Sequence, residues 1–157
     1  MTVLEIVKGQ DNPILRTVCK PVEAFDKELK GIISDMKDTL KRAKGLGIAA
    51  PQVGLDIRAF IFITDYGTKK QVVREAINPE VIFASDQQVI GEEGCLSLPN
   101  KFGNVYRPQE VIVSFFDVGG EQQKMRLEDL DARVFLHELD HINGVLFLDR
   151  LADSLIL

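Results

Sequence analysis

Both histidines of this chain lie in one short segment, His137-Glu138-Leu139-Asp140-His141, which restricts the fold more than any other feature. In an α-helix, residues four apart lie on the same face, one turn from each other. A helix through this segment would let both imidazoles reach one divalent metal ion, with Glu138 beside them to accept a proton. This H-E-x-x-H pattern is typical of metal-dependent hydrolases. We therefore expect a fold built around this helix.

The composition indicates a soluble globular protein. A chain of 157 residues, 45% of them hydrophobic and 27% charged, can bury a sizeable core, and we expect one domain over residues 1–157. A net charge of -5 argues against a dedicated nucleic-acid-binding protein, which needs a basic face. No apolar run suggests a membrane span, and the first residues do not resemble a signal peptide. We expect a cytoplasmic monomer.

Capping residues and the hydrophobic pattern together predict three helices. Asn12-Pro13 is typical of a helix start, and the short helix that follows should end before Pro21. An amphipathic pattern over residues 25–43 predicts a longer helix with one buried face. The last helix is expected from Glu128 through the histidine motif to Asn143-Gly144.

The segments between the helices favour strands, so we expect an α+β fold. The pattern contains no β–α–β alternation, which argues against a doubly wound parallel sheet. We expect mixed or antiparallel sheets packed around the C-terminal helix that carries the histidine motif. Strands are predicted at residues 57–64, 72–78, 81–85, 111–116 and 122–127, the last two forming a hairpin at Gly119-Gly120.

Two histidines are not enough for a catalytic metal site, which usually has three protein ligands and one open position. The chain has no glutamate after Glu138, and Phe147 stands where metzincins have their third histidine. Asp149 and Asp153 stay possible, although the chain there is expected to lead away from the site. The better candidate is Cys95, because a thiolate binds borderline metals strongly.

The two cysteines have different surroundings in the sequence. Cys19 lies in the first predicted helix with no motif around it, so we expect a small buried hydrophobic residue. Cys95 lies in a glycine-rich segment, Gly91 to Pro99, with no periodic pattern that would place it in a core. A disulfide is not expected in a cytosolic protein.

Three segments, in this order, resemble the three signatures of the peptide deformylase family. They are Gly45-Leu46-Gly47-Ile48-Ala49-Ala50-Pro51-Gln52, Glu93-Gly94-Cys95-Leu96-Ser97, and the histidine motif with Asn143-Gly144. The resemblance covers nearly the whole chain. It implies an α+β metallohydrolase that removes the formyl group from the N-terminal formylmethionine of newly made polypeptides and releases formate.

The resemblance also implies the roles of several residues. Cys95, His137 and His141 would bind one divalent metal, usually Fe(II), with Zn, Ni or Co as alternatives; ligand chemistry alone favours zinc. Metal-bound hydroxide would attack the formyl carbonyl, with Glu138 as general base and then general acid. The Gln52 side-chain amide and the Leu96 backbone N–H would stabilise the oxyanion.

A methionine side chain needs an apolar pocket, and the candidates are Leu46, Leu130 and Val134. Each could equally belong to the core. Leu130 and Val134 share a face of the motif helix with the histidines, and we expect that face to point inward among apolar neighbours. Gly47 and Gly94 would let the backbone approach the substrate closely.

Asp140 points to a different face of the motif helix from Glu138. We expect it to pair with Arg107 and so to orient the helix behind the metal ligands. A solvated surface pair that contributes little is the alternative.

The chain departs from the family at its end, Asp153-Ser154-Leu155-Ile156-Leu157. Bacterial deformylases commonly carry a longer, helical and often basic tail that helps docking on the ribosome. The short ending resembles the truncated deformylases encoded by some phages. We expect catalysis to survive without the longer tail, whereas docking on the ribosome through such a tail is in doubt.

Two other functions stay open at this point. A zinc endopeptidase uses the same histidine motif, although the downstream glutamate is missing here. A binding or structural module would need a closed site with a fourth protein ligand, and such a site would leave Glu138 without a task.

Overall fold

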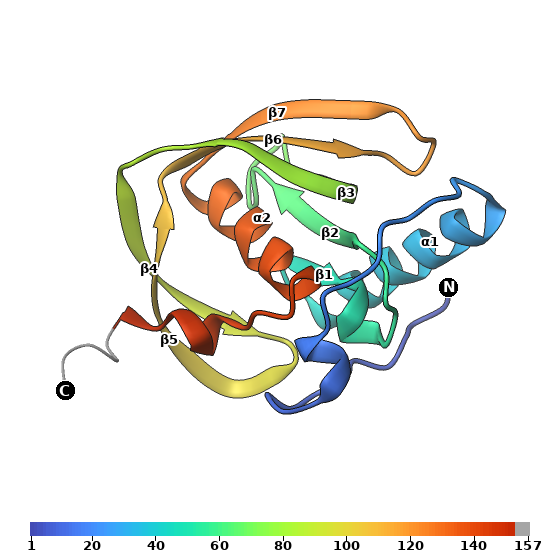
Figure 1. Ribbon diagram of the computed structural model, residues 1–157, viewed down its shortest axis with the longest axis horizontal. Helices are drawn as coiled ribbons and strands as arrows, with labels where there is room; N and C mark the ends of the chain where they lie inside the picture. Colours follow the sequence, from blue (N-terminus) through green and yellow to red (C-terminus); the bar gives the residue numbers. More distant parts are fainter. Residues whose placement is uncertain (153–157) are drawn as a thin grey trace.

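The computed structural model describes residues 1–152. In this part of the chain, two α-helices and seven strands are joined by short 3-10 helices (Figure 1). In order they are η1 (Pro13–Arg16), α1 (Lys27–Ala43), β1 (Gly47–Ala49), η2 (Ala50–Val53), β2 (Ala59–Thr64), β3 (Val72–Ala84), β4 (Gln88–Cys95), β5 (Leu98–Pro108), β6 (Glu110–Phe116), β7 (Gln122–Glu128), α2 (Asp129–Ile142) and η3 (Phe147–Arg150). Neither helix is long and apolar enough to cross a membrane.

The strands form two antiparallel sheets. The larger has the order β1-β2-β3-β6-β7, and β4 pairs with β5 in a separate two-stranded sheet. Figure 1 shows α2 between the two sheets and α1 on the other side of β2. The expected α+β fold around the motif helix is confirmed, as is the hairpin between β6 and β7.

β2 is buried on both faces, and all of its residues except Thr64 are apolar. Its side chains alternate between two layers. Phe60 and Phe62 point toward α2, where their ring centroids lie 5.0 and 5.2 Å from that of Phe135. Ile61 and Ile63 belong to the second apolar cluster, which includes the buried face of α1. The strand thus lies between two apolar clusters and contributes side chains to both, one against each helix.

Capping contacts fix the start of α1, and a glycine turn follows the end of α2. The Asp26 side chain accepts a hydrogen bond of 3.0 Å from the Leu29 backbone N–H at the start of α1. α2 ends at Ile142 with Asn143 as its C-cap, and Gly144 follows with a positive φ of 74°. A Cβ at this glycine would lie 2.7 Å from the Arg16 carbonyl oxygen, so only glycine allows the chain to turn here.

The first predicted helix is too long. η1 has four residues and ends at Arg16; the next residue, Thr17, has an extended backbone, so Cys19 does not lie in a helix. The Cys19 backbone N–H instead donates to the Ile142 carbonyl at 2.8 Å. Its side chain is buried, as expected, and this burial raises the pKa of the Cys19 thiol to about 11.

The strand predictions need two corrections. Segments 72–78 and 81–85 form one strand, β3, because a bulge absorbs Asn78 and Pro79. Asn78 has a φ of 51°, and its side chain bonds the backbone of Val22 at 2.9 Å through both oxygen and nitrogen. Strands β1, β4 and β5 were not predicted, because glycines and exposed side chains obscure their alternation. The expectations for Asp153 and the chain ending lie outside the described residues.

Candidate active site

The three predicted metal ligands come together from two elements. Cys95 is the last residue of β4, and His137 and His141 lie one turn apart on α2. Their ligand atoms all lie within 4.8 Å of one another. The distance from Cys95 Sγ to His141 Nε2 is 3.3 Å. A single ion could therefore contact all three.

The chemistry of this group fits a divalent metal. One sulfur and two imidazole nitrogens suit Fe, Co, Ni or Zn, and three ligands leave a coordination position open for water. Burial, with the nearby charge of His137, lowers the pKa of His141 well below its ordinary value, which favours the neutral, metal-binding form. Within residues 1–152, the group holds three ligand-type side chains, whereas a closed site needs four.

Glu93 orients His137 and was missed by the sequence analysis. Its Oε1 lies 2.8 Å from His137 Nδ1, which leaves Nε2 for the metal. Arg107 binds both carboxylate oxygens at 2.9 Å. Burial alone would raise the pKa of Glu93, but the hydrogen bonds from Arg107 and His137 hold that pKa well below its usual range. A prediction of β4 would have pointed to Glu93, because it lies two residues before Cys95 and residues two apart in a strand share a face.

The predicted pair of Asp140 and Arg107 is present, at 2.7 Å between Oδ2 and Nη1. Their side chains are only 11% and 5% exposed, which rules out a solvated surface pair. Arg150 from η3 also binds both oxygens of Asp140, at 2.7 and 3.0 Å. The surroundings of His137 are thus partly ionic rather than apolar, and Phe147 stacks on its ring at 6.3 Å.

Glu138 is buried beside the ligands, and within residues 1–152 its Oε1 has no hydrogen-bond partner. Burial raises the pKa of Glu138 to about 7. A Cβ at Gly47 would lie 2.6 Å from Glu138 Oε2. Gly47 is therefore required to give this carboxylate room, a reason that the sequence did not indicate.

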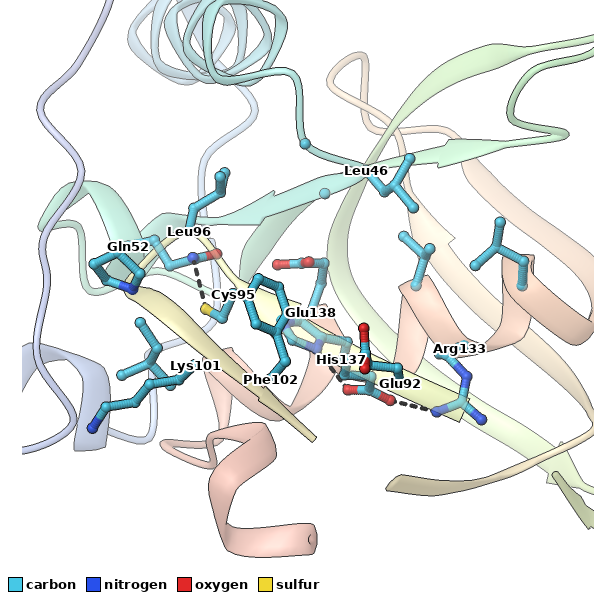
Figure 2. A pocket seen from close by; sticks show the side chains of 18 of the residues that line it. Leu46, Gln52, Glu92, Cys95, Leu96, Lys101, Phe102, Arg133, His137 and Glu138 are labelled. Carbon is cyan, nitrogen blue, oxygen red and sulfur yellow. Dashed lines mark hydrogen bonds and ion pairs between the residues drawn. The ribbon is translucent and has the colours of Figure 1, made fainter. Parts of the chain in front are cut away.

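Gln52 is held in one orientation behind the cysteine. Its Oε1 accepts the Ala49 backbone N–H at 2.9 Å, and its Nε2 donates to Ser97 Oγ at 3.2 Å and to Cys95 Sγ at 3.5 Å. Figure 2 shows Gln52 and Leu96 on the same side of Cys95.

A cavity of about 410 Å³ opens beside these groups. All five residues predicted to bind substrate line it: Leu46, Gly47, Gly94, Leu130 and Val134. Val134 is buried, as expected, whereas Leu130 is 44% exposed, so at Leu130 this helix face lines the open cavity and does not lie in the core. Besides Glu93, the sequence analysis missed four charged or aromatic lining residues: Glu92, Lys101, Phe102 and Arg133 (Figure 2).

A sequence profile described as Polypeptide deformylase matches residues 3–155. The chain belongs to the polypeptide deformylase family. A peptide deformylase of Brucella suis biovar 1 is 42% identical over 141 residues, which are 90% of this chain and 81% of that protein. Members of this family remove the formyl group from an N-terminal methionine with a metal, and this chain is such an enzyme.

Solved deformylase structures share the fold. The crystal structure of peptide deformylase from Thermotoga maritima has a TM-score of 0.88 and 39% identity, over 97% of this chain and 99% of that one. A class I type b deformylase from Acinetobacter baumannii, crystallised with Met-Ala-Ser bound, has a TM-score of 0.88 and 33% identity, over 96% of this chain and 100% of that one. The deformylase assignment decides against an endopeptidase and against a binding module with a closed metal site.

Proposed function

We propose that Cys95, His137 and His141 bind the single divalent metal of this deformylase. The main support is that their ligand atoms lie within 4.8 Å of one another, beside a buried carboxylate and a cavity. We further propose Fe(II) as the ion, on the strength of the family resemblance. Zn, Ni and Co suit the same ligands.

Glu138 is proposed to carry the proton between water and the leaving amine. A metal bound by the three ligands would act as a Lewis acid that lowers the pKa of a water toward 7. The raised pKa of Glu138, about 7, suits both acceptance and return of a proton near neutral pH. Its Oε1 is the buried oxygen left without a partner in residues 1–152, so it is available for this exchange.

Gln52 and Leu96 are proposed to stabilise the oxyanion that develops on the formyl group. Two hydrogen bonds fix the Gln52 amide: its Oε1 accepts from the Ala49 N–H, and its Nε2 donates to Ser97 Oγ. Its contact with Cys95 Sγ is longer, at 3.5 Å, so this second N–H is the weakly bonded one and is proposed to donate to the substrate when the sulfur binds metal. The Leu96 backbone N–H follows directly after the cysteine.

The substrate is proposed to be an N-formylmethionyl peptide. The methionine side chain would lie in the cavity against Leu46, Leu130 and Val134, with Gly47 and Gly94 on the backbone side. The related enzyme with Met-Ala-Ser bound supports a peptide that begins with methionine. We propose a single-domain, cytoplasmic monomer that binds neither nucleic acid nor membrane.

Formate release from formyl-Met-Ala-Ser tests this proposal. The protein would be purified anaerobically, its metal identified by mass spectrometry, and its activity measured after loading with Fe(II), Zn, Ni or Co. We expect the Fe(II) protein to release formate. The Cys95→Ala variant should neither release formate nor retain the metal. Full activity of Cys95→Ala would overturn the ligand set, and native protein containing zinc alone would overturn the choice of iron.

A further inference from the structure

Arg133 has no place in the mechanism, although it lines the cavity and its side chain is only 12% exposed (Figure 2). It precedes His137 by four residues, so the two side chains share a face of α2. Both bind one carboxylate: Arg133 Nη1 lies 2.7 Å from Glu93 Oε2, and His137 Nδ1 lies 2.8 Å from Glu93 Oε1. Glu93 is therefore held at both oxygens by neighbouring turns of one helix.

Arg133 also binds the backbone of the two-stranded sheet. Its Nη2 donates to the Val89 carbonyl at 2.7 Å, and its Nη1 donates to the carbonyls of Val105 at 2.9 Å and Gly91 at 3.4 Å. A Cβ at Gly91 would lie 2.9 Å from Arg133 Cζ, so the strand is shaped to admit the guanidinium. These contacts join α2 to both β4 and β5.

We propose that Arg133 is a positioning residue of the metal centre. It holds β4, which carries Cys95, against α2, which carries both histidines, and it fixes the carboxylate that orients His137. The proposal rests on the ligand set proposed above.

A second connection between the sheet and α2 runs through Arg107 and Asp140, on the C-terminal side of His137. Arg133 acts on the N-terminal side. Without it, Glu93 keeps Arg107 and His137, but the carbonyls of Val89 and Gly91 in β4 lose their hydrogen bonds to the helix. The separation between the cysteine and the histidines is then less tightly fixed.

Titration of metal-free protein with Co(II) tests the proposal, because cobalt absorption reports ligand geometry and its sulfur charge-transfer band reports Cys95. Arg133→Met should weaken Co(II) binding by about 10–100-fold, the usual effect of removing a group that supports a metal ligand. The charge-transfer band should also shift or weaken, and Arg133→Lys should restore part of both. Arg126→Met on β7, whose side chain is 62% exposed, is the matched control and should leave both unchanged.

A folded Arg133→Met protein with unchanged Co(II) affinity and spectrum would overturn the proposal, whatever its melting temperature. If that variant does not fold, Gly91→Ala carries the test, because it crowds the guanidinium without removing its charge. We expect a smaller loss of Co(II) affinity, and no loss would again overturn the role of Arg133. A failure of the ligand set is distinguishable, since Cys95→Ala would then keep the sulfur band.

Discussion

The carboxylate of Glu138 depends on the absence of a side chain at Gly47, 91 residues earlier in a chain of 157. A motif identifies Glu138 but says nothing of the space it needs. The space comes from β1, a strand of three residues whose glycine faces the carboxylate. The pair shows how the proposed proton carrier and the residue that gives it room can lie in separate sequence signatures.

Removal of the proposed proton carrier should separate chemistry from metal binding. Glu138→Ala keeps all three proposed ligands, so we expect one equivalent of metal by mass spectrometry. Turnover should fall by about 10²–10⁴-fold, the usual contribution of general acid–base catalysis. Loss of the metal, or full activity, would contradict the role given to Glu138.

Gly47→Ala should impair the enzyme through the same carboxylate. The added methyl group would lie 2.6 Å from Glu138 Oε2, and the displaced carboxylate should lower kcat by up to about 10²-fold with metal retained. Gly31→Ala is the control, since Gly31 is exposed on α1 and a Cβ there would meet nothing within 4 Å. That variant should keep full activity and gain about 0.5–1 kcal/mol in urea unfolding. Equal kcat in both variants would contradict the steric argument.

Helices and strands differ in how far their sequence predicts them. α1 and α2 were predicted to within two residues at each end, because helix periodicity and caps are local signals. β4 and β5 were missed, since glycines and exposed apolar residues replace regular alternation in them. With β4 unrecognised, the contact of Glu93 with His137, 44 residues away, could not be inferred.

The docking of α2 depends on one aromatic cluster. Phe135 contacts Phe60, Phe62 and Phe115, all buried. Phe135→Ala should therefore cost about 3–5 kcal/mol of unfolding free energy in urea. Tyr66→Ala, at a side chain 54% exposed in a loop, should change it little. Similar midpoints for the two variants would show that the cluster does not stabilise the helix.

At the scale of the whole molecule, the proposed metal would connect α2, which lies between the two sheets, to β4. Because such an ion binds the folded chain, a thousandfold excess over its dissociation constant adds about 4 kcal/mol. Removal of metal with a chelator should therefore lower Tm by on the order of 10 °C, measured by calorimetry. Cys95→Ala should melt at one temperature with or without added metal. A chelator-independent Tm in the native protein would contradict this coupling.

The burial of β2 between the two helices also sets the order in which backbone amides become accessible to solvent. Its N–H groups pair with β1 and β3, and both faces are covered, so their hydrogen exchange should require complete unfolding. The two-stranded sheet of β4 and β5 has fewer neighbours, and its amides should exchange earlier through local opening. The cysteine therefore lies in a sheet that we expect to open before β2 does, whereas both histidines lie on the helix that packs against β2.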